Sequence, residues 1–145
     1  MLDERLPVIV GVGQVNDRPA NPVEGMDPVE LMAAALEKAQ ADAGAALLAD
    51  ADYLGAVQQI SFPTIADACE PLAGRLGASP AVMFQSHGPN GDSPVMLLNE
   101  AANRIGAGEA TIAIVAGAEA LRTAGARPAA AAPHGQKPDA LPQAP

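Results

Sequence analysis

Short apolar segments alternate along the chain with stretches that carry helix-start and helix-stop signals, and this alternation constrains the fold most. The apolar segments fall at 7–12, 54–60, 81–85 and 110–116, and the helical patterns at 28–43, 69–76 and 94–105. The connections between them are short, which favours right-handed crossovers between parallel strands. The sequence therefore predicts an α/β fold with the order β-α-β-α-β-α-β and a mostly parallel sheet.

The ends of two helices are marked by local chemistry. Asp27 can accept a hydrogen bond at the start of the first long helix, and Glu30 can bond back to the N–H of Asp27 to complete a capping box. Gly44 is placed to end this helix. For the helix predicted at 94–105, Gly106 is the expected stop.

The composition of the chain argues against several folds and partners. The chain is 49% hydrophobic but only 2% aromatic, so its core must use aliphatic residues, which suits helices on a parallel sheet better than a β-sandwich. Its net charge of −9 and its lack of a basic patch argue against a nucleic-acid partner. The acidic N-terminus and the short apolar runs argue against a signal peptide and a membrane partner. We expect a cytoplasmic protein.

The C-terminal end of the chain differs in character from the rest. From residue 124 onward, prolines recur at short intervals and apolar periodicity is lost. Such a segment cannot bury enough apolar surface to order itself. The sequence predicts a folded domain over 1–123 and a disordered Ala/Pro-rich tail over 124–145.

The turn before the helix at 94–105 is the strongest candidate site, and it contains His87, Gly91, Asp92 and Ser93. A helix N-terminus presents free N–H groups and a partial positive charge, which suit an anion or a thiolate. His87 could act as a general base or only as a hydrogen-bonding loop residue. Asp92 and Ser93 are common capping residues, and the cap is the favoured interpretation of Ser93 because no nucleophile elbow surrounds it.

Other motifs support simpler interpretations. The glycines in 10–13 follow an apolar run, but the third glycine position of a dinucleotide motif is Asn16 and no helix begins there. Cys69, the single cysteine, has acidic neighbours that would raise its pKa, so it is interpreted as a small apolar filler. His87 and His134 are too few for a zinc site, and we predict no metal.

Residues 6–123 resemble the N-terminal half-domain of the thiolase superfamily. The resemblance lies in PVIVGVGQVNDRP (7–19), PVELMAAALEKAQADAG (28–44) and NEAANRIGAGEATIAIVAGAEALRT (99–123). The last block is the most specific, because a helix and an apolar strand precede Gly117, Ala118 and Glu119 in register. It is similar to SCP2-related thiolase-like proteins that are often labelled acetyl-CoA acetyltransferases. The resemblance implies an incomplete thiolase fold with the strand order 3-2-1-4, numbered along the chain.

The same resemblance implies an acyltransferase of lipid metabolism that acts on an acyl-CoA thioester and needs no further cofactor. Its cysteine nucleophile belongs where this chain has Gly91, and the rest of the motif falls on Ser93 and Pro94. Glycine cannot form an acyl-enzyme, and nothing after Thr123 resembles the C-terminal catalytic half. We therefore expect this chain alone to be inactive. The alternative is a non-catalytic interaction module that forms a homodimer through the strand at 81–86, which the order 3-2-1-4 places at a sheet edge.

Overall fold

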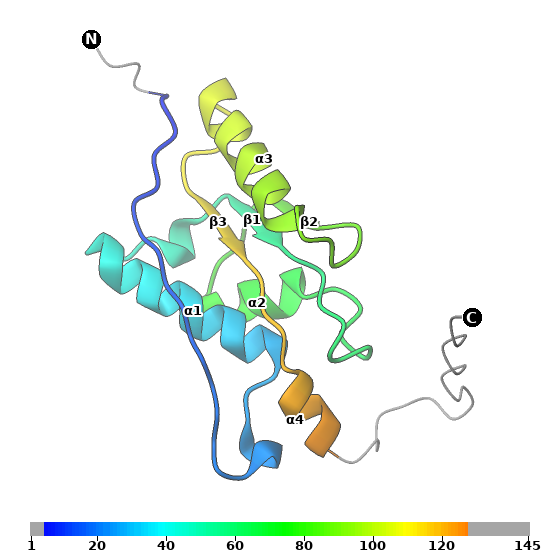
Figure 1. Cartoon of the computed structure of the whole chain (residues 1–145). Coiled ribbons are helices and arrows are strands. Elements are labelled where there is room, and N and C mark those ends of the chain that lie inside the picture. Colours follow the sequence, from blue (N-terminus) through cyan, green and yellow to red (C-terminus); the bar gives the residue numbers. More distant parts are fainter. Residues whose placement is uncertain (1–4, 128–145) are drawn as a thin grey trace, which may run out of the picture.

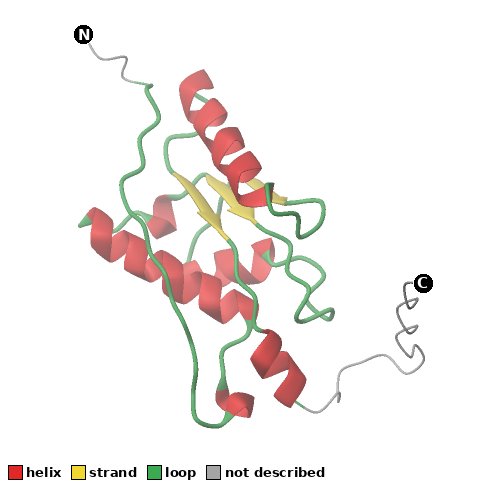
Figure 2. Cartoon of the chain, viewed as in Figure 1, coloured by secondary structure: helices red, strands yellow, loops and turns green. Residues whose placement is uncertain are grey.

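The computed structural model describes residues 5–127 and shows helices around a small sheet (Figures 1 and 2). The helices are α1 (Pro28–Ala43), α2 (Cys69–Leu76), α3 (Ser93–Ala107) and α4 (Leu121–Ala126), with short 3-10 turns η1 (Pro22–Glu24) and η2 (Leu48–Asp50). The strands are β1 (Tyr53–Ala56), β2 (Val82–Gln85) and β3 (Ala113–Ala116).

The three strands form a parallel sheet in the order β2-β1-β3. Helix α3 packs on one face against β1 and β3, and α1 and α2 lie on the other face (Figure 1). Side chains alternate accordingly: Leu54 and Ile114 join the core under α1 and α2, whereas Tyr53 and Ala113 belong to the cluster under α3. The layered α/β architecture predicted from the sequence is confirmed.

The predicted ends of α1 are confirmed in atomic detail. The backbone N–H of Glu30 donates to Asp27 Oδ1 at 2.9 Å, and the N–H of Asp27 donates to Glu30 Oε2 at 3.0 Å. Gly44 ends the helix in the left-handed conformation, with φ of 69°. These local interactions define both ends of the helix.

The predicted end of α3 at Gly106 is wrong. The helix continues through Gly106 and ends at Gly108, whose φ is 76°. The N–H of Glu109 then donates to the carbonyl of Arg104 at 2.8 Å. Gly108 is the glycine that takes the left-handed conformation, which closes the helix with bonds to its last carbonyls.

Residues 7–12 do not form the predicted strand, so the order 3-2-1-4 is corrected. Strands β1 and β3 pair with each other directly, which leaves no place between them for another strand. Residues 7–13, which we call the strap, instead run as extended chain along α1. A Cβ atom at Gly11 would overlap the carbonyl oxygen of Ala39, and one at Gly13 would overlap that of Ala35. The two glycines therefore allow the strap to lie directly on the helix backbone.

The predicted domain boundary at Thr123 falls inside α4. Thr123 is buried, and Arg127 extends the packing by donating from Nη2 to the carbonyl oxygen of Gly25 at 2.7 Å. Residues 128–145 of the predicted disordered tail lie outside the described residues. No helix among residues 5–127 has the length and apolar character that crossing a bilayer requires.

Candidate functional site

The candidate turn lies at the carboxyl edge of the parallel sheet. Loops 57–61, 86–92 and 117–120 follow the three strands there, and α3 begins at the same edge (Figure 1). Ligand sites of open α/β sheets form outside the carboxyl ends of the strands. The position of the turn is therefore suitable for a binding site.

Hydrogen bonds centred on Gly88 fix the shape of the turn. The N–H of Gly88 donates to Gln58 Oε1 at 2.6 Å, and its φ is 98°. The hydroxyls of Ser86 and Ser93 both donate to the Gly88 carbonyl oxygen, at 3.1 and 3.2 Å. The N–H of Gln58 donates to Ser86 Oγ at 3.0 Å, which ties the turn to the end of β1. These bonds connect the turn to the end of β1 and to the first residue of α3.

The interpretation of Ser93 as a helix cap is wrong. Ser93 is the first residue of α3, and Asp92 occupies the cap position without a side-chain capping bond. The Ser93 side chain is buried and its hydroxyl donates to Gly88. Ser93 therefore holds the turn together and does not present a free hydroxyl.

The other candidates of the turn are exposed. A Cβ atom at Gly91 would meet no neighbour within 4 Å, so a side chain fits there without displacing the fold. His87 lies edge-on to Phe84, with ring centroids 5.4 Å apart. Among residues 5–127, no hydrogen bond joins the side chains of His87, Asp92 and Ser93 to one another. The turn is an open helix start and not an assembled acid–base group.

Cys69 lies outside the turn and is chemically quiet. It is buried at the start of α2. Burial, followed by the negative charge and hydrogen bond of Asp67, raises the pKa of its thiol from 9.0 to about 12. The thiol stays protonated near neutral pH and is a poor nucleophile.

Cys69 is expected to resist alkylation in the folded chain. At pH 8, iodoacetamide should modify it at least about tenfold more slowly than in the urea-unfolded chain, because burial and the raised pKa both lower the exposed thiolate fraction. The thiol loses its proton at a lower pH in the unfolded chain than in the folded chain. The free energy of unfolding should therefore fall as pH rises from about 9 to about 12. Cys69→Ala should lack this part of the decline. Equal alkylation rates in the two states would contradict the prediction.

Glu119 has a structural role that the sequence pattern did not reveal. Its carboxylate accepts hydrogen bonds from the N–H groups of Ile60 and Ser61, at 2.8 and 3.1 Å. The N–H of Ala120 in turn donates to Ser61 Oγ at 3.0 Å. These bonds join the loops after β1 and β3. The only sequence signal was the position of Gly117, Ala118 and Glu119 after an apolar strand.

No group of three or more His, Cys, Asp or Glu side chains that could hold a metal ion exists among residues 5–127. The strap glycines, which were weighed for dinucleotide binding, are occupied by close contact with α1. The turn at the start of α3 remains the candidate site.

Comparison with known proteins supports the fold. No protein-family model and no curated protein matches the chain. Among solved structures, the chain is similar to a monomeric SCP2-thiolase-like protein type 1 from Mycobacterium smegmatis, with 32% sequence identity and a TM-score of 0.67. The match covers 81% of this chain and 24% of that one, so the chain spans about a quarter of its neighbour. The chain therefore has the α/β fold of a thiolase-like half-domain.

Proposed function

We propose that this chain is part of a thiolase-like protein that binds acyl-CoA thioesters at the start of α3, and that it forms no acyl-enzyme there. The observation that carries the proposal is the 32% identity to an SCP2-thiolase-like protein over most of the chain. The exposed, hydrogen-bonded turn at the carboxyl edge of the sheet supports the location. We include in this proposal that the protein is related to acetyl-CoA acetyltransferases.

The chemistry of the turn argues for binding without covalent transfer. Acyl transfer needs a nucleophile at the helix start, and Gly91, at the position of the family cysteine, has no side chain to supply one. The Ser93 hydroxyl is buried and donates to Gly88. At the start of α3, Ser93 already donates its N–H to the carbonyl oxygen of Asn90 at 3.1 Å and Pro94 has no N–H, so it is the partial positive charge of the helix end that can attract a thioester carbonyl oxygen. Asp92 beside them would repel a free carboxylate more than a neutral thioester.

Incubation with radiolabelled acetyl-CoA is expected to leave the wild-type chain unlabelled, because no free nucleophile stands at the helix start. Gly91→Cys should fold normally, since a side chain meets no neighbour there. It should gain a thiol that alkylating agents modify far faster than Cys69. Gly91→Ala is the matched control, with the same steric change and no thiol.

Two results would contradict this proposal. Stable acetyl labelling of the wild-type chain, mapped by mass spectrometry to Ser93 or Cys69, would show a different nucleophile. If calorimetry shows no binding of acyl-CoA thioesters, these compounds are not ligands of this chain.

A non-catalytic interaction module is the second candidate, and the β2 edge favours it. Strand β2 lies at the edge of the sheet, with Met83 and Phe84 41% and 37% exposed. An edge strand with apolar side chains can pair with a second copy of the chain. The similar solved protein from Mycobacterium smegmatis is monomeric.

A further inference from the structure

Asn90 and Gly91 form the one Asn–Gly pair of the sequence, and both residues are exposed in the turn before α3. In such a pair, the backbone nitrogen of the glycine can attack the side-chain amide carbon of the asparagine. Glycine favours this reaction because it has no Cβ atom to hinder the approach. The sequence thus places a chemically labile amide in the loop that leads into α3.

The backbone nitrogen of Gly91 is available for this attack. Among residues 5–127, the N–H of Gly91 donates no hydrogen bond, and a Cβ atom on this residue would meet no neighbour within 4 Å. The N–H of Ser93 donates to the carbonyl oxygen of Asn90 at 3.1 Å, and this bond spans Gly91 without using its N–H. No acceptor in the described part of the chain therefore competes for the proton that the reaction must remove.

The side chain of Asn90 is held loosely. Its Nδ2 donates to the carbonyl oxygen of His87 at 3.5 Å, which is longer than usual for a hydrogen bond. Within residues 5–127, the Asn90 side chain makes no other hydrogen bond. The amide can therefore turn toward the nitrogen of Gly91 at the loss of one weak bond.

The other asparagines lack one or more of these features. Asn99 and Asn103 are also exposed, but the residues that follow them lie inside α3, where the helix uses the backbone N–H groups. Asn21 precedes Pro22, which has no N–H. Asn16 precedes a residue whose side chain hinders the approach. Exposure, an unhindered neighbour and a free N–H coincide at Asn90.

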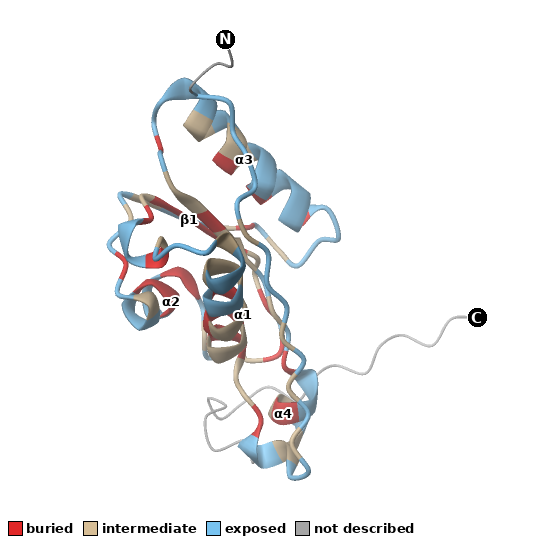
Figure 3. Ribbon diagram, turned by 90° about the vertical axis from the view of Figure 1, so that its left-hand side faces the viewer, coloured by how far each residue is buried: buried red, intermediate tan, exposed pale blue. Residues whose placement is uncertain are grey.

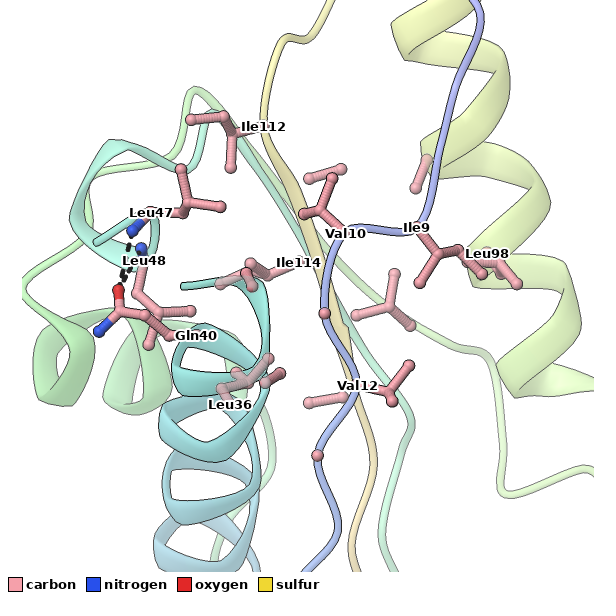
Figure 4. A pocket seen from close by; sticks show the side chains of 18 of the residues that line it. Ile9, Val10, Val12, Leu36, Gln40, Leu47, Leu48, Leu98, Ile112 and Ile114 are labelled. Carbon is pink, nitrogen blue, oxygen red and sulfur yellow. Dashed lines mark hydrogen bonds between the residues drawn. The ribbon is translucent and has the colours of Figure 1, made fainter. Parts of the chain in front are cut away.

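The apolar cavity between α1, α3, β3 and the strap does not shield this pair (Figure 4). Its walls include Val10, Leu98 and Ile114, and Pro94 is the lining residue closest in sequence to the turn. Neither residue of the Asn–Gly pair lines the cavity. An occupant of the cavity therefore need not cover the pair.

We propose that Asn90 is a site of spontaneous deamidation. The backbone nitrogen of Gly91 bonds to Cγ of Asn90 and gives up its proton, the bond from Cγ to Nδ2 breaks, and ammonia leaves. Water then opens the cyclic succinimide at either of its carbonyl groups, which gives aspartate or isoaspartate at position 90. Water is the only co-reactant of this sequence.

Either product changes the start of α3. The aspartate adds a second carboxylate close to Asp92, at a helix end that tolerates negative charge. The isoaspartate also lengthens the main chain, and the carbonyl group that accepts the N–H of Ser93 becomes part of a free carboxylate. The turn therefore gains negative charge as the protein ages, and in the isoaspartate form its backbone changes as well.

Peptide mapping by mass spectrometry, during incubation of the full chain at mildly alkaline pH, tests the proposal. Position 90 should deamidate at least about tenfold faster than Asn99 or Asn103 of the same chain, because the N–H that follows it is free. Gly91→Ala should slow the reaction at least about tenfold by adding a Cβ atom. This variant should fold normally, since the position has open space and no positive φ. Asn90→Gln is the matched control, which keeps an amide but should stay unmodified because its longer side chain disfavours ring closure.

The rate in the folded chain shows whether the structure leaves the pair free. It should lie within about threefold of the rate in the guanidinium-unfolded chain, because a single long hydrogen bond holds the side chain. A folded chain that reacts at least about tenfold more slowly than the unfolded chain overturns the proposal, since the turn then protects Asn90. Hydroxylamine, which cleaves the succinimide, should cut the folded wild type between positions 90 and 91 and leave Asn90→Gln intact. A wild type that also stays intact overturns the proposal.

Binding of acetyl-CoA separates this proposal from the proposed function, on which this part of the test rests. Asn90→Asp copies the aspartate product, and at low salt it should bind acetyl-CoA at least about threefold more weakly than Asn90→Gln, because its carboxylate repels the CoA phosphates. Deamidation of a wild type that binds no acetyl-CoA supports the modification and contradicts the proposed function. A wild type that binds acetyl-CoA but keeps Asn90 unmodified supports the proposed function and overturns the modification.

Discussion

Leu97→Ala is expected to lower the free energy of unfolding by about 3 kcal/mol, whereas Leu98→Ala should lower it by less than about 1 kcal/mol. The two leucines are adjacent on α3 but face different surroundings. Leu97 is 1% exposed, and its side chain lies against Gly55 of β1. Leu98 is 43% exposed. Truncating Leu97 leaves a void in packed core, while truncating Leu98 removes few contacts.

Urea unfolding followed by circular dichroism measures both variants. The Leu→Ala change in helix propensity is the same at neighbouring positions of one helix, so the difference between the variants isolates packing. The dependence of the unfolding free energy on urea should stay constant, which shows that the folded and unfolded states are otherwise unchanged. Equal losses for the two variants would mean that α3 does not pack on the sheet as described.

Local chemistry explains which parts of the fold could be predicted from the sequence. The start of α1 depends on Asp27 and Glu30, three residues apart, and its end depends on Gly44. The end of α2 is equally local, because Gly77 closes it in the left-handed conformation with φ of 65°, whereas no side chain caps its start at Ala68. Interactions of this kind are complete within one helical turn, so the pattern alone identifies them.

The sheet could be predicted only in part, because strand pairing depends on residues far apart. The β-branched strap has the composition of a buried parallel strand, but β1 and β3 bond directly and exclude it. Strand lengths were overestimated for the same reason. Apolar character extends to Ile60 after β1, yet its N–H donates to Glu119 instead of a neighbouring strand. The apolar pattern of a segment indicates whether it tends to form a strand, but it does not show which strand it pairs with.

The candidate site could likewise be predicted only in part. Its place at the start of α3 follows from the helix pattern, and the exposure of Gly91 agrees with a site there. The role of Ser93 could not be derived locally, because its partner Gly88 takes its position from Gln58, 30 residues away. A serine before proline has the sequence of a cap, and only the fold shows that it is buried.

The 145-residue chain is expected to self-associate in solution through the outer face of α3. Val95, Met96 and Leu98 are 60%, 57% and 43% exposed, and Figure 3 shows much of α3 in the colour of exposed residues. Soluble monomers rarely leave contiguous apolar patches of more than a few hundred Å² exposed. The chain spans only 24% of the solved protein that it resembles, so surfaces that are covered in a longer protein can be open here. The net charge of −9 opposes association but is screened at physiological salt.

Sedimentation velocity and binding of a hydrophobic dye test this expectation on the wild type and three variants. The wild type should sediment as oligomers and bind dye, and the Val95→Glu/Met96→Glu variant should be largely monomeric with reduced dye binding. Asn99→Glu/Asn103→Glu adds the same charge to α3 without removing an apolar side chain, so it should remain associated. If this control also dissociates, charge repulsion and not apolar contact decides the result. If Phe84→Glu is monomeric and Val95→Glu/Met96→Glu remains associated, the chains contact each other through the β2 edge and not through α3. That result supports the interaction module. A monomeric wild type that binds no dye contradicts both, because each requires an apolar surface that seeks a partner.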